Sequence, residues 1–161
     1  GVDLARARGR AARRVKGAVG FVFQNSLAAL DPRMSVGASI AEPLRAHGGL
    51  RGAALDARVT ELLAAVELPA SWERRYPHEL SGGMAQRVCI GIALAQRTRF
   101  LLADEPTGEL DTATARSIAE TLGEVAASRR ATVIVATHDL DLAAMAQRRL
   151  DLVDGEDVTQ G

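Results

Sequence analysis

Three short apolar segments, at residues 18–23, 100–103 and 132–137, most constrain how this chain can fold. They are four to six residues long and almost free of polar side chains, which is typical of strands buried in a parallel sheet. Two parallel strands need a crossover of about a dozen residues or more, and the intervals between these segments are long enough to hold helices. The sequence therefore predicts an α/β fold built on a parallel sheet.

Between these segments the hydrophobic period becomes that of helices. Apolar residues recur every three or four positions from Leu55 to Val66, and Ser81 is a suitable N-cap for a helix that follows it. We also predict a loop at 25–35, helices at 36–44, 112–127 and 139–146, and an edge strand at 150–153 followed by a turn. The helix from residue 36 is expected to end near Pro43 or at 47–49. Residues between Gln24 and Arg99 thus form a mostly helical insertion in the α/β pattern.

The charge balance argues against a general affinity for nucleic acids. The 161 residues include 20 basic and 20 acidic side chains, a formal net charge of +0, so no global positive field is present. We expect the basic run from Arg6 to Lys16 to be a solvated face. The longest apolar run, at 88–95, is far shorter than the roughly 20 residues that span a bilayer. The single cysteine, Cys89, permits no internal disulfide and is expected to be buried.

Polar residues follow all three predicted strands. Gln24 follows the first strand, Asp104 and Glu105 the second, and His138 the third. Ligands of open α/β sheets bind at the carboxyl ends of the strands, so we expect a site there. Adjacent carboxylates can hold Mg²⁺ and can orient or deprotonate a water molecule. The SGG step at 81–83 opens a predicted helix, where free N–H groups and missing side chains favour a phosphate.

Four motifs resemble, in order and spacing, those of the ATP-binding cassette (ABC) ATPases. FVFQ at 21–24 resembles the Q-loop, LSGGMAQR at 80–87 the signature, FLLADEPTGELD at 100–111 the Walker B segment with the D-loop, and VIVATHD at 133–139 the H-loop. Four ordered motifs are much more specific than any one of them.

This resemblance implies a P-loop NTPase-like parallel sheet with helices and an inserted α-helical subdomain. It divides the chain into a partial RecA-like core at 1–24, the helical subdomain at 25–98, and the rest of the core at 99–161.

The resemblance also assigns roles to the residues that follow the strands. Asp104 resembles the Walker B aspartate of the Mg²⁺ shell, and Glu105 the carboxylate that polarises water for attack on the γ-phosphate of ATP. His138 resembles the switch histidine that contacts this phosphate. Gln24 resembles the Q-loop glutamine, which touches Mg²⁺ and the attacking water and links the core to the helical subdomain. ATP and Mg²⁺ are therefore the implied cofactors.

Other motif residues are implied to act across a dimer. Ser81, Gly82 and Gly83 resemble the signature that covers the γ-phosphate of ATP held by a second ABC ATPase subunit. Asp111 resembles the D-loop aspartate that crosses this interface. The dipeptide at 108–109, Gly-Glu, departs from the small residues that more often precede the D-loop aspartate.

One element of the family's pattern has no counterpart in the sequence. The Gly-rich GxxxxGK[ST] loop, whose N–H groups and lysine cradle the phosphates of ATP, is absent. The sole lysine, Lys16, is followed by Gly17 and Ala18 rather than by serine or threonine. We therefore expect an N-terminally truncated piece of an ABC ATPase, with a sheet that lacks the P-loop strand. The isolated chain is expected to be inactive.

The sequence resembles two transporter groups in different places. Residues 25–44 and 76–87 resemble the ATPases of peptide and nickel importers, which we favour, whereas residues 105–111 and 150–158 resemble the lipoprotein and macrolide exporters. Implied partners are transmembrane permease subunits, contacted through the helical subdomain and the Q-loop region, and a second ABC ATPase subunit. The implied location is cytoplasmic, peripheral on the inner face of the cell membrane. A non-catalytic subunit that donates its signature to a partner is an alternative, and a partner nucleic acid is disfavoured.

Overall fold

The computed structural model describes residues 18–158 apart from 97, 109, 129–130 and 155. The basic run at 6–16, most of the predicted unit 1–24, and Glu109 therefore lie outside the described residues. The elements are β1 (Val19–Val22), α2 (Ser26–Ala29), α3 (Val36–Gly48), α4 (Gly52–Ala65), two 3-10 turns (Ala70–Arg74 and Pro77–Glu79), α5 (Gly82–Ala95), β2 (Phe100–Asp104), α6 (Thr112–Ala127), β3 (Thr132–Ala136), α7 (Leu140–Ala144), β4 (Leu152–Val153) and β5 (Glu156–Asp157).

The predicted parallel sheet is present, with the three strands in the order β1-β2-β3. Val22 is paired with Ala103, and Ala103 with Val135, so all three strands end at the same edge. The crossover from β1 to β2 holds α2 to α5, and the crossover from β2 to β3 holds α6. The prediction of an α/β fold with a mostly helical insertion is confirmed. No helix among the described residues is long and apolar enough to span a membrane.

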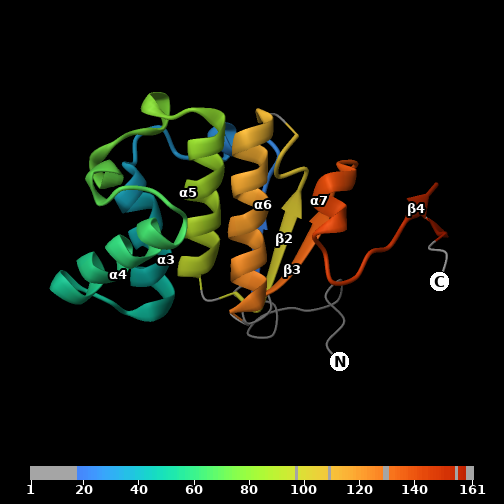
Figure 1. Cartoon of the computed structure of the whole chain (residues 1–161). Helices are drawn as coiled ribbons and strands as arrows, with labels where there is room; N and C mark the ends of the chain where they lie inside the picture. Colours follow the sequence, from blue (N-terminus) through green and yellow to red (C-terminus); the bar gives the residue numbers. More distant parts are fainter. Residues whose placement is uncertain (1–17, 97, 109, 129–130, 155, 159–161) are drawn as a thin grey trace.

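Helices cover one face of this sheet. In Figure 1, α5 and α6 stand side by side, with α3 and α4 beyond α5, and α5 packs on β1 while α6 packs on β3. Val22 and Leu101 point into this layer and are almost fully buried. Burial of such side chains stabilises the fold by roughly 1.5–3 kcal/mol each.

The other face of the sheet corrects one prediction. All three strands were expected to be buried, but Phe21 is 55% exposed and Ile134 is 51% exposed. The reason is geometric, because successive side chains of a strand point to opposite faces and α5 and α6 pack on only one of them. Phe21 and Phe23, two residues apart on the exposed face, stack with their ring centroids 5.9 Å apart.

The predicted loop at 25–35 and the predicted end of the helix that follows it had different outcomes. The segment at 25–35 contains the one-turn helix α2, which is capped by the Asn25 side chain accepting a hydrogen bond from the Ala28 N–H at 3.1 Å. Helix α3 continues through Pro43 and ends at Gly48, where it is capped by Gly49, whose φ of 65° suits a glycine C-cap. The later of its two predicted ends is therefore correct.

The C-terminal segment forms its own small sheet. Residues 150–153 were predicted to be an edge strand, but β4 pairs antiparallel with β5, in a separate two-stranded sheet. The turn between them includes Asp154 at a φ of 50°, a left-handed conformation that aspartate tolerates better than most residues. A local hairpin therefore replaces pairing with the main sheet.

Arg87 of α5 connects three helices. Its side chain, 13% exposed, donates to the Val66 carbonyl at 2.9 Å, to Glu67 at 2.6 Å and to Ser117 at 2.6 Å. The hydrogen bonds from Arg87 and then from Ser117 hold the pKa of the Glu67 carboxyl below its ordinary value. One guanidinium thus ties α5 to the end of α4 and to α6.

We expect Arg87→Met to lower the free energy of unfolding by about 2 kcal/mol, because it leaves the Val66 carbonyl and the Ser117 hydroxyl without this donor. Urea denaturation of the full chain measures the loss. Arg58→Met is the matched control, since Arg58 makes an exposed pair with Glu61 at 2.6 Å that contributes at most about 1 kcal/mol. Equal losses in the two variants would contradict the structural role of Arg87.

Candidate functional site

The polar residues that follow the strands do meet at one edge of the sheet. Asp104 is the last residue of β2 and is paired with Ala136 of β3, so Glu105 and Thr137 continue from neighbouring strand ends. Gln24 lies just beyond β1, which is paired with β2 on its other side. The edge predicted to carry the site therefore holds Gln24, Asp104, Glu105 and His138.

Glu105 and His138 are in direct contact. Glu105 Oε1 accepts from the His138 backbone N–H at 3.0 Å and lies 2.7 Å from His138 Nδ1, and its Oε2 accepts from the Thr137 hydroxyl at 2.9 Å. Glu105 has a φ of 43°, a conformation that is rare for residues other than glycine. Residues in such conformations are often found at functional sites. Its backbone N–H donates to the Ala136 carbonyl at 2.9 Å and helps to hold this conformation. The carboxylate is thus held through three hydrogen bonds by the two residues that follow β3.

The contact shifts the pKa values of both partners. Partial burial raises the pKa of Glu105, but the hydrogen bonds from His138 and Thr137 together outweigh this effect. The pKa of Glu105 therefore lies below its ordinary value of 4.5. The hydrogen bond to Glu105, and next the charge of that carboxylate, raises the pKa of His138 above its ordinary value of 6.5. The stabilisation from the charged pair is therefore present between these two pKa values. It is lost as pH falls through the value of Glu105 or rises through that of His138.

We expect Glu105→Gln to lower the pKa of His138, because the amide keeps the size of the side chain but removes its charge. An NMR titration of the imidazole in the full chain, in Mg²⁺-free buffer, measures the pKa directly. Glu120→Gln is the control, since Glu120 pairs with Arg116 on the exposed face of α6 and is expected to leave His138 unchanged. A His138 pKa that is the same in Glu105→Gln as in the unsubstituted chain would contradict the pairing.

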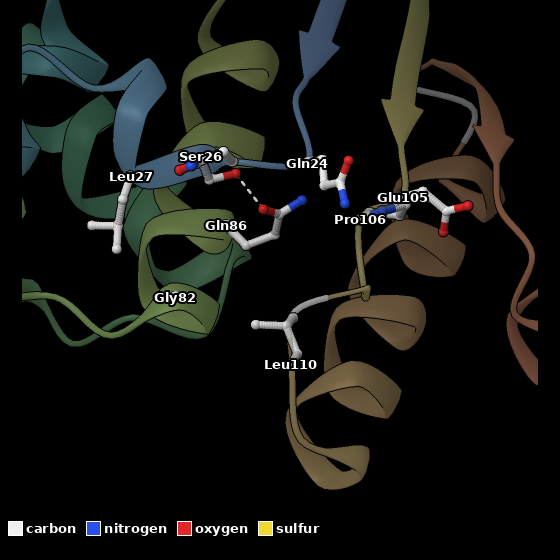
Figure 2. A pocket seen from close by; sticks show the side chains of 9 residues that line it. Gln24, Ser26, Leu27, Gly82, Gln86, Glu105, Pro106 and Leu110 are labelled. Atoms are coloured by element: carbon white, nitrogen blue, oxygen red, sulfur yellow. Dashed lines mark hydrogen bonds between the residues drawn. The ribbon is translucent and has the colours of Figure 1, made fainter.

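A small pocket lies where α5 approaches the edge of the sheet. Gln24, Gly82 and Glu105, three residues that the sequence singled out, line it together, as Figure 2 shows. The remaining lining residues come from α2 and the segment before it, from α5, and from the loop after β2: Asn25, Ser26, Leu27, Gln86, Pro106 and Leu110. The pocket thus joins the ends of β1 and β2 to the beginning of the signature helix.

The other predicted residues do not line this pocket. Ser81 is the N-cap of α5, as predicted, and its backbone N–H lies 3.3 Å from the Met84 sulfur. Asp111 is the N-cap of α6 and accepts from the Thr114 N–H at 3.1 Å and from the Thr114 hydroxyl at 2.6 Å. Gly83 lies against α6, where a β-carbon would overlap the Cγ2 methyl of Thr114. Each of these residues therefore has a structural role at a helix start, beside the role implied by the resemblance.

Sequence reasoning did not single out three residues of the site. Thr137 holds Glu105. Ser26 and Gln86, which are both almost fully buried, are in hydrogen-bond contact with each other. Gln86 lies inside the signature-like motif, on the buried face of α5 with Cys89, Ile90 and Ala93. A glutamine within an otherwise apolar helical stripe was the available signal. Cys89 is buried as expected, and burial raises the pKa of its thiol.

The donors at the edge of the sheet fit Mg²⁺ better than a metal bound by protein alone. Among the described residues, no group of three His, Cys, Asp or Glu side chains is arranged to hold a metal. Mg²⁺ usually keeps several waters and takes one or two carboxylates together with the phosphates of a substrate. Asp104, exposed at the end of β2, and the exposed amide of Gln24 are suitable oxygen donors for such an ion.

These motifs and this fold are those of a known family. The sequence profile of the ABC transporter family matches residues 1–108, and the chain belongs to this family. It is 42% identical over 152 residues to the dipeptide transport ATP-binding protein DppD of Haemophilus influenzae, covering 92% of this chain and 46% of that protein. It is 41% identical over 165 residues to a putative peptide import ATP-binding protein of Brucella abortus, covering 99% and 48%. The chain spans about half the length of the curated relatives it matches.

Solved structures agree with this family. A post-hydrolysis dimer of the ATP-binding cassette MJ0796 bound to ADP and Pi matches with a TM-score of 0.81 and 31% identity, covering 96% of this chain and 67% of that one. CbiO1 of Clostridium perfringens, part of the ABC transporter complex cbiONQ, matches with a TM-score of 0.85 and 25% identity, covering 96% and 61%. The fold predicted from the four motifs is therefore confirmed.

Proposed function

We propose that this chain carries the hydrolytic residues of a Mg²⁺-dependent ATPase that powers peptide import. The observation that supports this most directly is the carboxylate of Glu105, held by Thr137 and His138 at the ends of β2 and β3, beside Gln24. Family membership supports ATP as the nucleotide, and the names of the relatives support peptides as the cargo.

Each residue of the site has a distinct part in this proposal. Asp104 and Gln24 would hold Mg²⁺, which supplies positive charge at the β- and γ-phosphates. Glu105 orients the attacking water and accepts its proton at a carboxylate oxygen. The His138 ring contacts the γ-phosphate, and its side chain, 84% exposed, is accessible for this contact. The hydrogen bond between Glu105 and His138 would link proton acceptance to phosphate contact.

The proposed enzyme works as a pair of ABC subunits. Ser81, Gly82 and Gly83 present the start of α5 to the γ-phosphate of ATP bound by the partner subunit, and Asp111 lies at their interface. Ser81 and Gly82 are exposed, which supports this role. The solved structure of the related cassette MJ0796 is a dimer, which supports it as well. Free backbone N–H groups at the start of a helix can donate hydrogen bonds to a phosphate.

We further propose a division of labour along the chain. Residues 1–24 and 99–161 belong to the ATP-binding core, and residues 25–98 form the helical subdomain that meets transmembrane permease subunits together with the Q-loop region. The protein would then lie in the cytoplasm, on the inner face of the membrane. The packing of α3, α4 and α5 on one another supports a helical unit in this region.

Hydrolysis of ATP by the natural gene product, purified with its partners, tests this function. We expect turnover that a chelator of Mg²⁺ abolishes and that addition of Mg²⁺ restores, because the metal neutralises the phosphate charge. The isolated 161-residue chain, which lacks the GxxxxGK[ST] motif, is expected to hydrolyse no ATP. Absence of Mg²⁺-dependent turnover from the complete complex would instead favour the non-catalytic subunit that only donates its signature.

A further inference from the structure

The buried amide of Gln86 has an unused hydrogen-bond donor at the pocket. Gln86 is 3% exposed, and its Oε1 is in hydrogen-bond contact with the Ser26 hydroxyl. Its Nε2 has no hydrogen-bond partner among the described residues. A buried donor without a partner is unfavourable, because it has lost its hydrogen bonds to water, so a local arrangement that satisfies it is favoured.

The Ser26 hydroxyl indicates what that arrangement is. Ser26 Oγ lies 3.0 Å from the Phe23 carbonyl as well as in contact with Gln86 Oε1. A hydroxyl has one hydrogen and cannot donate to both acceptors. If the Gln86 amide is turned about its last bond, Nε2 donates to Ser26 Oγ and the Ser26 hydroxyl donates to the Phe23 carbonyl. Gln86 Nε2 then has a partner, and the Ser26 hydroxyl has a single acceptor. Gln86 Oε1 now faces the pocket as an acceptor.

Gln24 is the amide that this acceptor meets. Gln24 and Gln86 line the same pocket, and in Figure 2 the Gln86 amide points towards Gln24. A glutamine amide that is free to turn presents either its oxygen or its NH₂ group to a neighbouring ion or water. An acceptor on one side of Gln24 binds its NH₂ group and leaves its oxygen pointing elsewhere.

We propose that Gln86 is a positioning residue that sets the orientation of Gln24. Gln86 Oε1 accepts a hydrogen bond from Gln24 Nε2, so that Gln24 Oε1 is the atom offered to Mg²⁺ and the attacking water. The chain of bonds runs from the Phe23 carbonyl through Ser26 and Gln86 to Gln24, and it connects the end of β1 to the signature helix α5. The role of Gln24 towards Mg²⁺ and water rests on the proposed function, whereas the hydrogen bond between Gln86 and Gln24 does not.

NMR of the side-chain amides in the full, ¹⁵N-labelled chain tests the bond without nucleotide. We expect an order parameter of about 0.8 for the Gln24 NH₂ group, falling below about 0.6 in Gln86→Met, which fills the same space without an acceptor. Gln147, an exposed glutamine, gives the value of a free side-chain amide. A Gln24 as mobile as Gln147 in the unsubstituted chain, or one unaffected by Gln86→Met, overturns the proposal. Ser26→Ala removes the acceptor for Gln86 Nε2 and should loosen Gln24 as well, should Gln86→Met not fold.

Kinetics of the natural gene product provide the second measurement. We expect Gln86→Met and Gln24→Met each to lower kcat by about 10- to 100-fold, with KM for ATP little changed, because a misplaced group chiefly affects the reacting geometry. The double variant should be no slower than Gln24→Met alone, since Gln86 acts through Gln24. Additive losses would overturn the proposal. A gene product without ATPase activity would remove the proposed function, while the NMR comparison would still decide whether Gln86 orients Gln24.

Discussion

Glu105→Gln should slow ATP hydrolysis by the natural gene product by about 100-fold or more, which is the contribution expected of a general base. The amide is close in size to the carboxylate: its oxygen can still accept from the His138 N–H, and its NH₂ group can donate to the Thr137 hydroxyl oxygen, so the loop after β2 should keep its shape. It cannot take up a proton from water at neutral pH. ATP should therefore bind but turn over slowly, and the ATP-bound dimer should accumulate.

Two measurements separate this outcome from a folding defect. Size-exclusion chromatography with ATP should show the variant as a lasting dimer, and urea denaturation should show only a small loss of stability. Glu120→Gln, on the exposed face of α6, is the control and should hydrolyse ATP at the normal rate. Hydrolysis by Glu105→Gln within twofold of normal would remove Glu105 from the role of base.

The elements with a strong local signal could be predicted from the sequence. Helix α6 has the bounds that were predicted, Thr112–Ala127, because Ile118, Leu122 and Val125 recur at helical spacing and Asp111 is a good N-cap. Helix α5 begins after Ser81 for the same reason. The hydrophobic period and the N-cap residue of a helix depend only on residues close together in the chain, so both can be recognised in a single sequence.

The elements that were missed depend on distant or weak interactions. The exposure of Phe21 and Ile134 depends on which face of the sheet the helices cover, and an apolar run does not specify this. Strand β4 lies within the predicted strand at 150–153, but its antiparallel partner β5 was missed, because two residues are too few for a periodic pattern. Helix α2 has only four residues and is stabilised by its cap and by packing on α5 rather than by its own sequence.

The site was predictable where the topology of a parallel sheet determines it. Gln24, Asp104, Glu105 and His138 meet because parallel strands end at one edge. The contact of Glu105 with Thr137 was not predictable, since it depends on the positive φ at Glu105. The burial of Gln86 was missed, because a short motif does not state which of its members face inward; its place in an otherwise apolar helical stripe was the one available signal.

Gly83→Ala should lower the free energy of unfolding of the full chain by about 1–3 kcal/mol, the usual cost of overpacking. In an open position within a helix, alanine instead stabilises by roughly 0.5–1 kcal/mol relative to glycine. The overlap of the new β-carbon with Thr114 therefore outweighs the helix propensity. Gly82→Ala is the matched control, because its β-carbon would meet Leu110 at an ordinary distance of 3.6 Å and should cost little. Urea denaturation compares the two variants.

Thr114→Ser tests whether the Thr114 methyl is the cause. It removes the Cγ2 methyl that the new β-carbon meets, yet keeps the hydroxyl that donates to Asp111 at 2.6 Å. The double variant with Gly83→Ala should regain most of the lost stability. If Gly83→Ala is no less stable than Gly82→Ala, close packing between α5 and α6 does not explain why residue 83 is glycine. A role in phosphate approach would then be the better account, and both variants should lower ATP hydrolysis while leaving the fold intact.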